Sequence, residues 1–167
     1  GISGAEAVAA THDTPGLVQA DRRFDDRVAV TAAARYFHGR PGAVLNVGGE
    51  KFSLLLFDEY GRYSGLKTNT SCAAGTGSFL DQQAGRLNLS GIAELSEIAA
   101  SNKGELPKIA SRCAVFAKTD LIHAQQEGYS LAEICDGLCC GLARNIADTV
   151  FKHEKIRHPV VFCGGVA

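Results

Sequence analysis

The first part of the chain combines one helical pattern with several short apolar runs. Residues 25–38, DDRVAVTAAARYFH, are rich in alanine and begin with acidic residues, which favours a helix that starts there. The run AVLNVGG at 43–49 contains β-branched residues and stops at two glycines, so it predicts a buried strand. KFSLLLFD at 51–58 predicts a second strand, and the turn EYGRY leads into a third around 64–68. Residues 1–20 show no clear period.

Helical spacing of apolar residues dominates the second part. It predicts helices over 78–89, over 90–101, over 118–128 and after Ser130. The apolar stripe of the last helix has steps of three and four: Leu131, Ile134, Leu138, Leu142, Ile146 and Val150. PVVFCGG at 159–165 then predicts a final buried strand that ends in glycines.

Short polar signals mark the ends of these helices. Ser90 is predicted to be an N-cap, with Glu94 in the first turns. Gly128 ends the helix that precedes it. Ser130 is predicted to cap the long helix, with Glu133 as its capping-box partner. The order of helix, three strands, several helices and a strand predicts an α/β or α+β fold with a sheet core.

Length and composition narrow the class of protein. The 167 residues suit one domain with a substantial core, and 46% apolar and 21% charged residues are typical of globular chains. A formal net charge of -1 gives no basic surface for nucleic acid or an anionic membrane. No apolar run approaches the roughly 18–20 residues of a membrane helix, and no secretory segment opens the chain. We therefore expect a cytoplasmic protein, and the start without methionine and the end after a strand predict an excerpt of a longer one.

Three glycine turns each follow a predicted strand. They are NVGGE at 46–50, AAGTG at 73–77 and CGGVA at 163–167. Glycine lets the backbone approach a ligand and point amides at phosphate oxygens. In open α/β sheets ligands gather at the carboxyl ends of strands, so the three turns predict a nucleotide cleft. Neither a GxxxxGK[ST] loop nor a GxGxxG motif is present.

The six cysteines divide into two groups. Cys135, Cys139, Cys140 and Cys163 lie on or beside apolar stretches and are predicted to be small buried residues. In a reducing compartment a disulfide framework is not expected.

Cys72 and Cys113 lie at junctions between loops and helices, where a structural role and a metal site are both open. Two thiolates do not complete a four-coordinate site, so a metal would need a symmetry mate. His123, three residues after Asp120, has a metal-binding spacing but suits a solvated helix face better. Lys118 and Arg112 are surface or ligand-proximal charges.

Four stretches in this order resemble the BadF/BadG/BcrA/BcrD ATPase family: VLNVGGEKFSLLLFD, NTSCAAGTGSFLDQQA, IASRCAVFAKTDLIH and VVFCGGVA. The match runs from about residue 43 to 167. The resemblance implies an α/β fold of the actin-like (sugar kinase/Hsp70/actin, ribonuclease H-like) type. Residues 43–167 would form its second nucleotide-binding lobe, truncated at the C-terminal end, and residues 1–42 the tail of the first lobe or a connecting helix.

The resemblance also implies the site residues. NVGGE replaces a phosphate loop usually written DIGGQ, with Glu50 as its catalytic side chain. The nucleotide-binding residues, for ATP or ADP with Mg²⁺, would be Gly48, Gly49, Glu50, Gly75, Thr76, Gly77, Gly164, Gly165 and Val166. Cys72 and Cys113 would bind one 4Fe-4S cluster shared across a homodimer, two cysteines from each protomer.

The chain departs from the family's usual phosphate-loop sequence at two positions that bear on activity. Asn46 replaces the aspartate of the phosphate loop, and Glu50 replaces the glutamine. An amide binds a metal more weakly than a carboxylate, and a carboxylate repels a γ-phosphate unless Mg²⁺ intervenes, so we expect slower hydrolysis or a different metal set. The family's first phosphate loop is absent from these residues, so this part alone is not expected to hydrolyse ATP.

The function implied is that of an ATP-dependent activator. It would take a low-potential electron from reduced ferredoxin or flavodoxin onto the cluster. It would then pass that electron to a CoA-thioester dehydratase or reductase, of the 2-hydroxyacyl-CoA dehydratase or benzoyl-CoA reductase type. The alternative from the residues alone is an actin-like kinase or nucleotide-regulated binding module whose cysteines are all buried. A lobe that only docks a partner is a third hypothesis.

Overall fold

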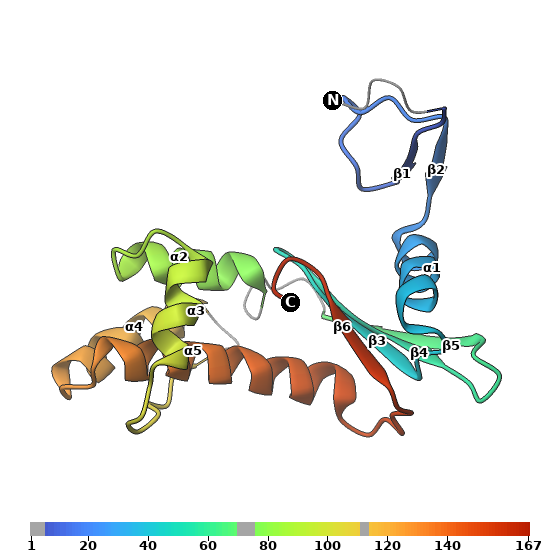
Figure 1. The fold of residues 1–167 in the computed structure, drawn as a ribbon. Helices are drawn as coiled ribbons and strands as arrows, with labels where there is room; N and C mark the ends of the chain where they lie inside the picture. Colours follow the sequence, from blue (N-terminus) through green and yellow to red (C-terminus); the bar gives the residue numbers. More distant parts are fainter. Residues whose placement is uncertain (1–5, 70–75, 111–113) are drawn as a thin grey trace.

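A four-stranded mixed sheet organises the structure, a computed structural model that describes residues 6–69, 76–110 and 114–167. Its strands are β3 (Ala43–Val47), β4 (Phe52–Phe57), β5 (Tyr63–Thr68) and β6 (Val160–Cys163), in the order β5-β4-β3-β6. β4 pairs antiparallel with both of its neighbours, β3 and β5, whereas β6 is parallel to β3 (Figure 1). The three predicted strands and the final strand are therefore confirmed.

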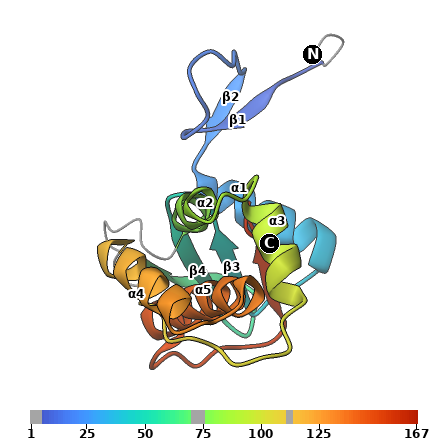
Figure 2. The same ribbon diagram turned by 90° about the vertical axis from the view of Figure 1, so that its left-hand side faces the viewer.

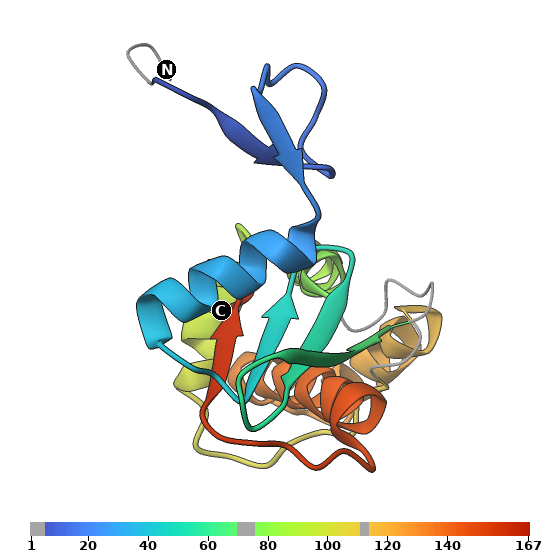
Figure 3. The same cartoon turned by 90° about the vertical axis from the view of Figure 1, so that its right-hand side faces the viewer.

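Helices cover the two faces unequally. α2 (Gly77–Arg86), α3 (Ile92–Ala100), α4 (Ala114–Gln126) and α5 (Leu131–Ile146) lie together on one side, in front of the sheet in Figure 2. A short π-helix, η1 (Ala147–Phe151), continues α5. On the opposite side lies α1 (Asp26–His38), which crosses the near side of the sheet in Figure 3.

The central strand β4 is buried on both faces. Phe52 and Leu54 point into the large core beneath α2, α4 and α5, whereas Leu55 and Phe57 pack against Ala34 of α1. This division follows from the alternation of side chains along a strand, in which the adjacent residues 54 and 55 point to opposite faces. Each fully buried side chain of this size contributes about 1.5–3 kcal/mol to the free energy of folding.

A second sheet lies apart from the first. β1 (Ala9–Thr11) and β2 (Arg22–Phe24) pair in parallel beyond the N-terminal end of α1 (Figure 1). The Arg23 guanidinium fixes the connecting loop, because it donates hydrogen bonds to the carbonyl oxygens of Thr11, Thr14 and Val18 at 3.1, 2.8 and 2.9 Å. These strands are not predicted from the sequence, since three residues are too few to show a period.

The helix signals are mostly confirmed. Ser130 and Glu133 form the predicted capping box, with Ser130 N donating to Glu133 Oε2 at 2.7 Å. Gly128, with φ +87°, follows the end of α4. The predicted cap at Ser90 is wrong by one position, because the N-cap of α3 is Gly91, with φ +154°. Ser90 instead donates from its amide and its hydroxyl to Glu94 Oε2, both at 2.7 Å.

Two expectations about burial are corrected. β6 is half-buried, with Phe162 52% exposed, because it lies at the edge of the described sheet. Leu131, at the first turn of α5, is 41% exposed, whereas the rest of its stripe is buried from Ile134 to Val150. No helix of the described ranges combines the length and the apolar character needed to cross a bilayer.

Candidate functional site

The described residues of the three glycine turns converge at one end of the four-stranded sheet. β3 and β6 are parallel, so their carboxyl ends meet there. The amides of Gly77 and Ser78, at the start of α2, donate to the carbonyl oxygens of Gly48 and Gly49 at 3.0 and 2.8 Å. The amide of Val166 donates to the carbonyl oxygen of Val47 at 3.3 Å. The structure thus brings together the described part of all three turns that the sequence singled out.

Close backbone packing explains why glycine occupies two of these positions. Gly164 has φ +109°, and a Cβ there would overlap the carbonyl oxygen of Val47. A Cβ on Gly77 would lie 3.1 Å from Val166 Cγ2 and 3.3 Å from Gly49 Cα. By contrast, a Cβ on Gly49 would meet only Ser78 Oγ, at 3.5 Å. The protein itself therefore does not require a glycine at position 49.

A cleft of about 600 Å³ opens beside this loop, towards α1. Asn46, Gly48, Gly49, Glu50 and Lys51 form one wall. Asp13, from the loop after β1, and Asp26, from the first turn of α1, contribute to the other wall. Asn46 also lines a smaller hollow of about 330 Å³ between α1 and β6, together with Cys163 and Gly164.

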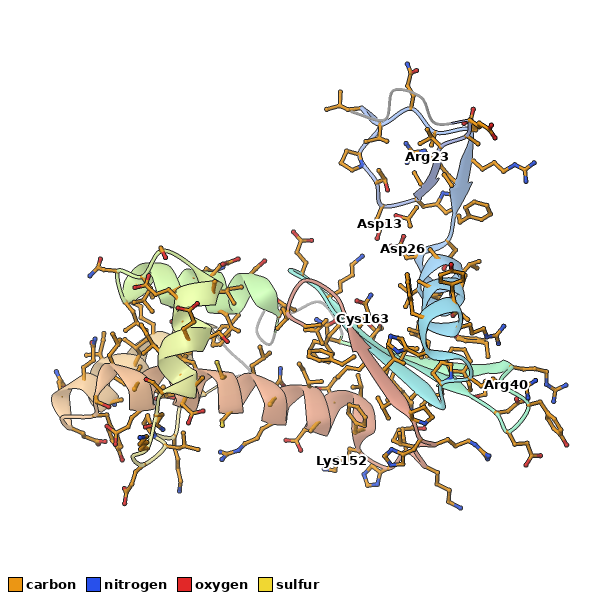
Figure 4. All side chains as sticks on the ribbon, viewed as in Figure 1. Asp13, Arg23, Asp26, Arg40, Lys152 and Cys163 are labelled. Atoms are coloured by element: carbon orange, nitrogen blue, oxygen red, sulfur yellow. The ribbon has the colours of Figure 1, made fainter. Side chains whose placement is uncertain are left out.

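Asp13 and Asp26 form a carboxyl pair that the sequence did not reveal. They point into the same space from different elements (Figure 4). The hydrogen bond with Asp26 and repulsion from its charge raise the pKa of Asp13, against the opposing effect of Lys51. Asp26 Oδ1 is buried and has no hydrogen-bond partner among the described residues. Two carboxylates near a lysine and a glycine loop are suited to a cation and a phosphate.

The predicted residues have different positions around the cleft. Gly48, Gly49 and Glu50 line it, with Glu50 exposed. Thr76, the N-cap of α2, is fully buried. Gly77 donates a hydrogen bond from its amide to the carbonyl oxygen of Gly48 and so holds the loop at 48–50. Three of the predicted site residues lie outside the described ranges: Cys72, Gly75 and Cys113. The turn of Gly164, Gly165 and Val166 lies on the β6 side of the loop, where Figure 4 labels the neighbouring Cys163.

The four described cysteines have thiols that resist ionisation. Burial raises the pKa of Cys139 to about 11, and burial is also the main cause of the raised pKa values of Cys135, Cys140 and Cys163. Cys135 is buried as predicted, whereas the other three are half-buried. Cys139 and Cys163 pack at the margins of the two core clusters. A metal prefers the thiolate, so these side chains suit packing better than coordination.

The spacing of Asp120 and His123 does not make a metal site in this structure. Asp120 Oδ2 accepts a hydrogen bond from the amide of Ala110 at 2.8 Å, and His123 is exposed. Within the described ranges, no group of three or more His, Cys, Asp or Glu side chains is arranged to hold a metal. The solvated helix face is therefore the better description of His123.

Known proteins resemble this chain along most of its length. A benzoyl-CoA reductase polypeptide of Thauera aromatica is 30% identical over 167 residues, which cover 99% of this chain and 58% of that protein. The 2-hydroxyisocaproyl-CoA dehydratase activator of Clostridioides difficile is 28% identical over 148 residues, 89% of this chain and 54% of the relative. The chain thus spans somewhat more than half the length of these relatives.

The comparison with solved structures finds the same kind of protein as the comparison of sequences. The activator of the 2-hydroxyisocaproyl-CoA dehydratase from Clostridium difficile, with bound ADPNP, superposes with a TM-score of 0.85 at 26% identity, covering 96% of this chain and 59% of the other. The (R)-2-hydroxyglutaryl-CoA dehydratase component A of Acidaminococcus fermentans gives a TM-score of 0.78 at 26% identity, over 88% and 55% of the two chains. The expected actin-like α/β fold is confirmed. Since the family model matches residues 6–167, the chain belongs to the BadF/BadG/BcrA/BcrD ATPase family.

Proposed function

We propose that the full-length protein is an ATP-dependent activator of an enzyme that acts on a CoA thioester. The observation that carries this proposal is the meeting of the described parts of three glycine turns beside an acidic cleft, at the carboxyl ends of β3 and β6. The names of the relatives support the kind of partner, a 2-hydroxyacyl-CoA dehydratase or a benzoyl-CoA reductase. The ADPNP bound to the similar activator structure supports an adenine nucleotide as the ligand.

The phosphates of ATP would contact the backbone at residues 48–50. The amides of Gly77 and Ser78 already bind the carbonyl oxygens of Gly48 and Gly49, so in this proposal the start of α2 fastens the loop. Gly49 lines the cleft and carries no side chain, so in this proposal the backbone there can approach a phosphate closely. Gly164, Gly165 and Val166 lie next to the loop on the β6 side, where we place the adenosine.

The carboxyl pair fits the divalent cation that accompanies ATP. Asp13 and Asp26 provide oxygen donors, which Mg²⁺ prefers, and Asp26 Oδ1 is a buried oxygen without a partner among the described residues. Bound Mg²⁺ would neutralise charge on the phosphates. Asp13, Asp26 and the Asn46 amide oxygen would hold it, and the two aspartates offset the carboxylate missing at position 46. Glu50, at the mouth of the cleft, would orient the attacking water.

The electron-transfer part of the proposal depends on Cys72 and Cys113. Burial raises the pKa values of the other four cysteines, which disfavours the thiolate that iron binds. Cys72 and Cys113 are proposed as the ligands from the resemblance of their motifs to the family. With two cysteines from each protomer, a homodimer would hold one 4Fe-4S cluster. Reduced ferredoxin or flavodoxin would supply the electron, and the CoA-thioester enzyme would accept it.

The phosphate loop and the cysteine segment are physically linked in this proposal. Residues 48–49 are bonded directly to the first turn of α2, and the segment with Cys72 immediately precedes that turn in sequence. A nucleotide that stabilises one position of the loop would also favour one position of α2, which is a population shift. We also propose that residues 43–167 form the second lobe and residues 1–42 the tail of the first lobe or a connecting helix. In support, β1 and β2 form their own sheet, whereas α1 packs against the sheet of residues 43–167.

The test uses the full-length protein purified without oxygen. We expect bound iron and sulfide, ATP hydrolysis, and ATP-dependent reduction of a purified 2-hydroxyacyl-CoA dehydratase by reduced ferredoxin. A colourless protein that transfers phosphate to a small molecule would replace this proposal with an actin-like kinase. A colourless protein that binds ATP without transfer would indicate a regulatory module, and one without affinity for nucleotide would indicate a docking lobe.

A further inference from the structure

The backbone of Lys51 has a fixed position at the edge of the nucleotide cleft. Lys51 ends the turn between β3 and β4, where the amide of Gly48 donates to the carbonyl oxygen of Lys51 at 2.8 Å. The next residue, Phe52, pairs with Val47 in the sheet and is buried in the large core. The main chain is therefore held on both sides of Lys51, and its position can change only through the long, flexible side chain.

The pleat of β4 directs this side chain into the cleft. Successive residues of a strand point to opposite faces of the sheet. Phe52 lies in the core on one face, so Lys51 and Ser53 face the other side, and both line the cleft. Asp13 and Asp26 lie on the opposite wall of the same cleft (Figure 4). The ammonium group of Lys51 therefore faces the carboxyl pair.

The charge of Lys51 is not taken up by an ion pair. The lysine and the arginine among the described residues that line the cleft are Lys51 and Arg27, and Arg27 is paired with Asp25 at 2.7 Å. Lys51 takes part in none of the ion pairs found among the described residues. It still acts on Asp13 at longer range: the hydrogen bond with Asp26 raises the pKa of Asp13, and the charge of Lys51 opposes that rise.

The described walls of the cleft carry more negative than positive charge. Outside the ion pair of Arg27, the carboxylates of Asp13, Asp26 and Glu50 line the cleft together with the ammonium group of Lys51. A positive charge close to carboxylates repels a second cation from the same place and weakens its binding. The phosphates of a nucleotide carry several negative charges and would attract the same ammonium group. One lysine can therefore oppose a cation in the empty cleft and stabilise phosphate in the filled one.

We infer that Lys51 is an internal counter-ion that admits the divalent cation to the carboxyl pair only together with the nucleotide. In the empty cleft its ammonium group compensates Asp13 and Asp26 and competes with a cation from solution. When phosphates bind at residues 48–50, the ammonium group turns towards them and the carboxyl pair becomes available. Cation and nucleotide then strengthen each other's binding reciprocally. This inference rests on the proposed function, because it assigns a regulation to the same cleft.

The first experiment needs no nucleotide. Mn²⁺, which prefers oxygen ligands as Mg²⁺ does, is titrated into the nucleotide-free full-length protein, and electron paramagnetic resonance measures the unbound ion. Lys51→Gln removes the charge and should bind Mn²⁺ about ten-fold more tightly than the wild type. Lys51→Arg keeps the charge and should match the wild type. Lys103→Gln, in the exposed loop after α3, is the matched control and should also match it.

The second experiment titrates ADP calorimetrically without divalent cation and with saturating Mn²⁺. Without cation, Lys51→Gln should bind ADP about five-fold more weakly than the wild type, because the phosphates lose a charged partner. The factor by which Mn²⁺ strengthens ADP binding should fall about ten-fold, which is the reciprocal of the gain in Mn²⁺ affinity. Chelation of Mn²⁺ by unbound ADP is the same for every variant and cancels in the comparison.

The two experiments separate this inference from the proposed function. Lys51 is exposed and its backbone carbonyl makes the bond to Gly48, so Lys51→Gln should melt within a few degrees of the wild type. Equal or weaker Mn²⁺ binding by folded Lys51→Gln would overturn the counter-ion role, whatever the result with ADP. Wild-type protein that binds no ADP at any Mn²⁺ concentration would contradict the proposed nucleotide site itself.

Discussion

At the scale of single residues, Gly49, in the loop at 48–50, and Gly164, in the turn after β6, are constrained differently. Gly164 has no room for a side chain, because the carbonyl oxygen of Val47 occupies that space. Gly49 has ordinary contact distance to one hydroxyl. A glycine that the protein does not need for its own packing is a candidate for contact with a ligand.

This difference predicts the behaviour of Gly49→Val. The fold should tolerate the variant, with a melting temperature within a few degrees of the wild type, because a side chain at 49 has space. ATP turnover of the full-length protein should fall about ten-fold or more, since the branched side chain blocks the approach of phosphate. Gly85→Val, on α2 with open space around it, is the matched control. Unchanged ATPase kinetics in Gly49→Val would remove residues 48–50 from the phosphate site.

A second residue prediction concerns the cation. Asp26→Asn removes one charge while keeping the size of the side chain, and we expect about ten-fold weaker binding of Mg²⁺ in the presence of ADP. The measurement is a calorimetric titration of Mg²⁺ into the full-length protein saturated with ADP. Asp81→Asn, exposed on α2, is the control and should leave the affinity unchanged. If Asp26→Asn binds Mg²⁺ as tightly as the wild type, the carboxyl pair does not hold the cation.

At the scale of elements, the beginning of α1 depends on an ionised carboxylate. Asp25 Oδ1 accepts hydrogen bonds from the backbone amide of Arg27 at 2.9 Å and from its guanidinium at 2.7 Å. The Arg27 side chain is the largest cause of the lowered pKa of Asp25, to about 2. The folded state therefore binds this proton less readily than the unfolded state, in which the pKa is 3.8.

The direction of this pKa shift leads to a prediction about pH. A lowered pKa in the folded state gives a stabilisation that is complete above about pH 4 and is lost as the pH falls towards 2. Asp25→Asn, which still caps the helix but cannot ionise, should melt below the wild type at pH 6 and approach it near pH 3. Thermal unfolding at both values gives the comparison. A gap in melting temperature that does not narrow on acidification would contradict this account.

The elements also show how far the sequence could predict the structure. Period and caps predicted the presence of β3 to β6 and of the helices, since those signals are local. They did not give every boundary, because the N-cap of α3 is Gly91 and α4 begins at Ala114. They did not reveal β1 and β2, whose pairing depends on a loop held by Arg23, nor the approach of Asp13 to Asp26 across that loop. An apolar run such as 160–163 also does not tell whether a strand lies at an edge, because that depends on its neighbours in space.

At the scale of the whole molecule, the proposed activator would share one cluster between two protomers. Cys72→Ser or Cys113→Ser should abolish the cluster, because each change removes two of the four ligands of a symmetric dimer. Cys139→Ser should keep the iron and cost about 1–3 kcal/mol of stability, since its half-buried hydroxyl replaces a thiol beside the core. The measurement is iron and sulfide per dimer after anaerobic reconstitution.

Two outcomes of that measurement would contradict the arrangement. About four irons per dimer in the Cys72 variant would exclude a bridging cluster that uses this residue. Loss of iron in the Cys139 variant alone would mean that the cluster uses the thiols of α5. The melting temperature of each variant separates loss of iron from loss of fold.

The parallel pairing of β3 with β6 also has a consequence for how the chain folds while the ribosome synthesises it. Ala43 pairs with Val160, more than a hundred residues later, whereas β3, β4 and β5 are joined by short turns. Local pairings form sooner because they close small loops, so the hairpins can form while synthesis continues. The end of the sheet that carries the glycine turns is completed only when β6 has left the exit tunnel. A nascent chain arrested before residue 160 should therefore protect the amides of β4 from hydrogen exchange but leave the loop at 48–49 without its β6 neighbour.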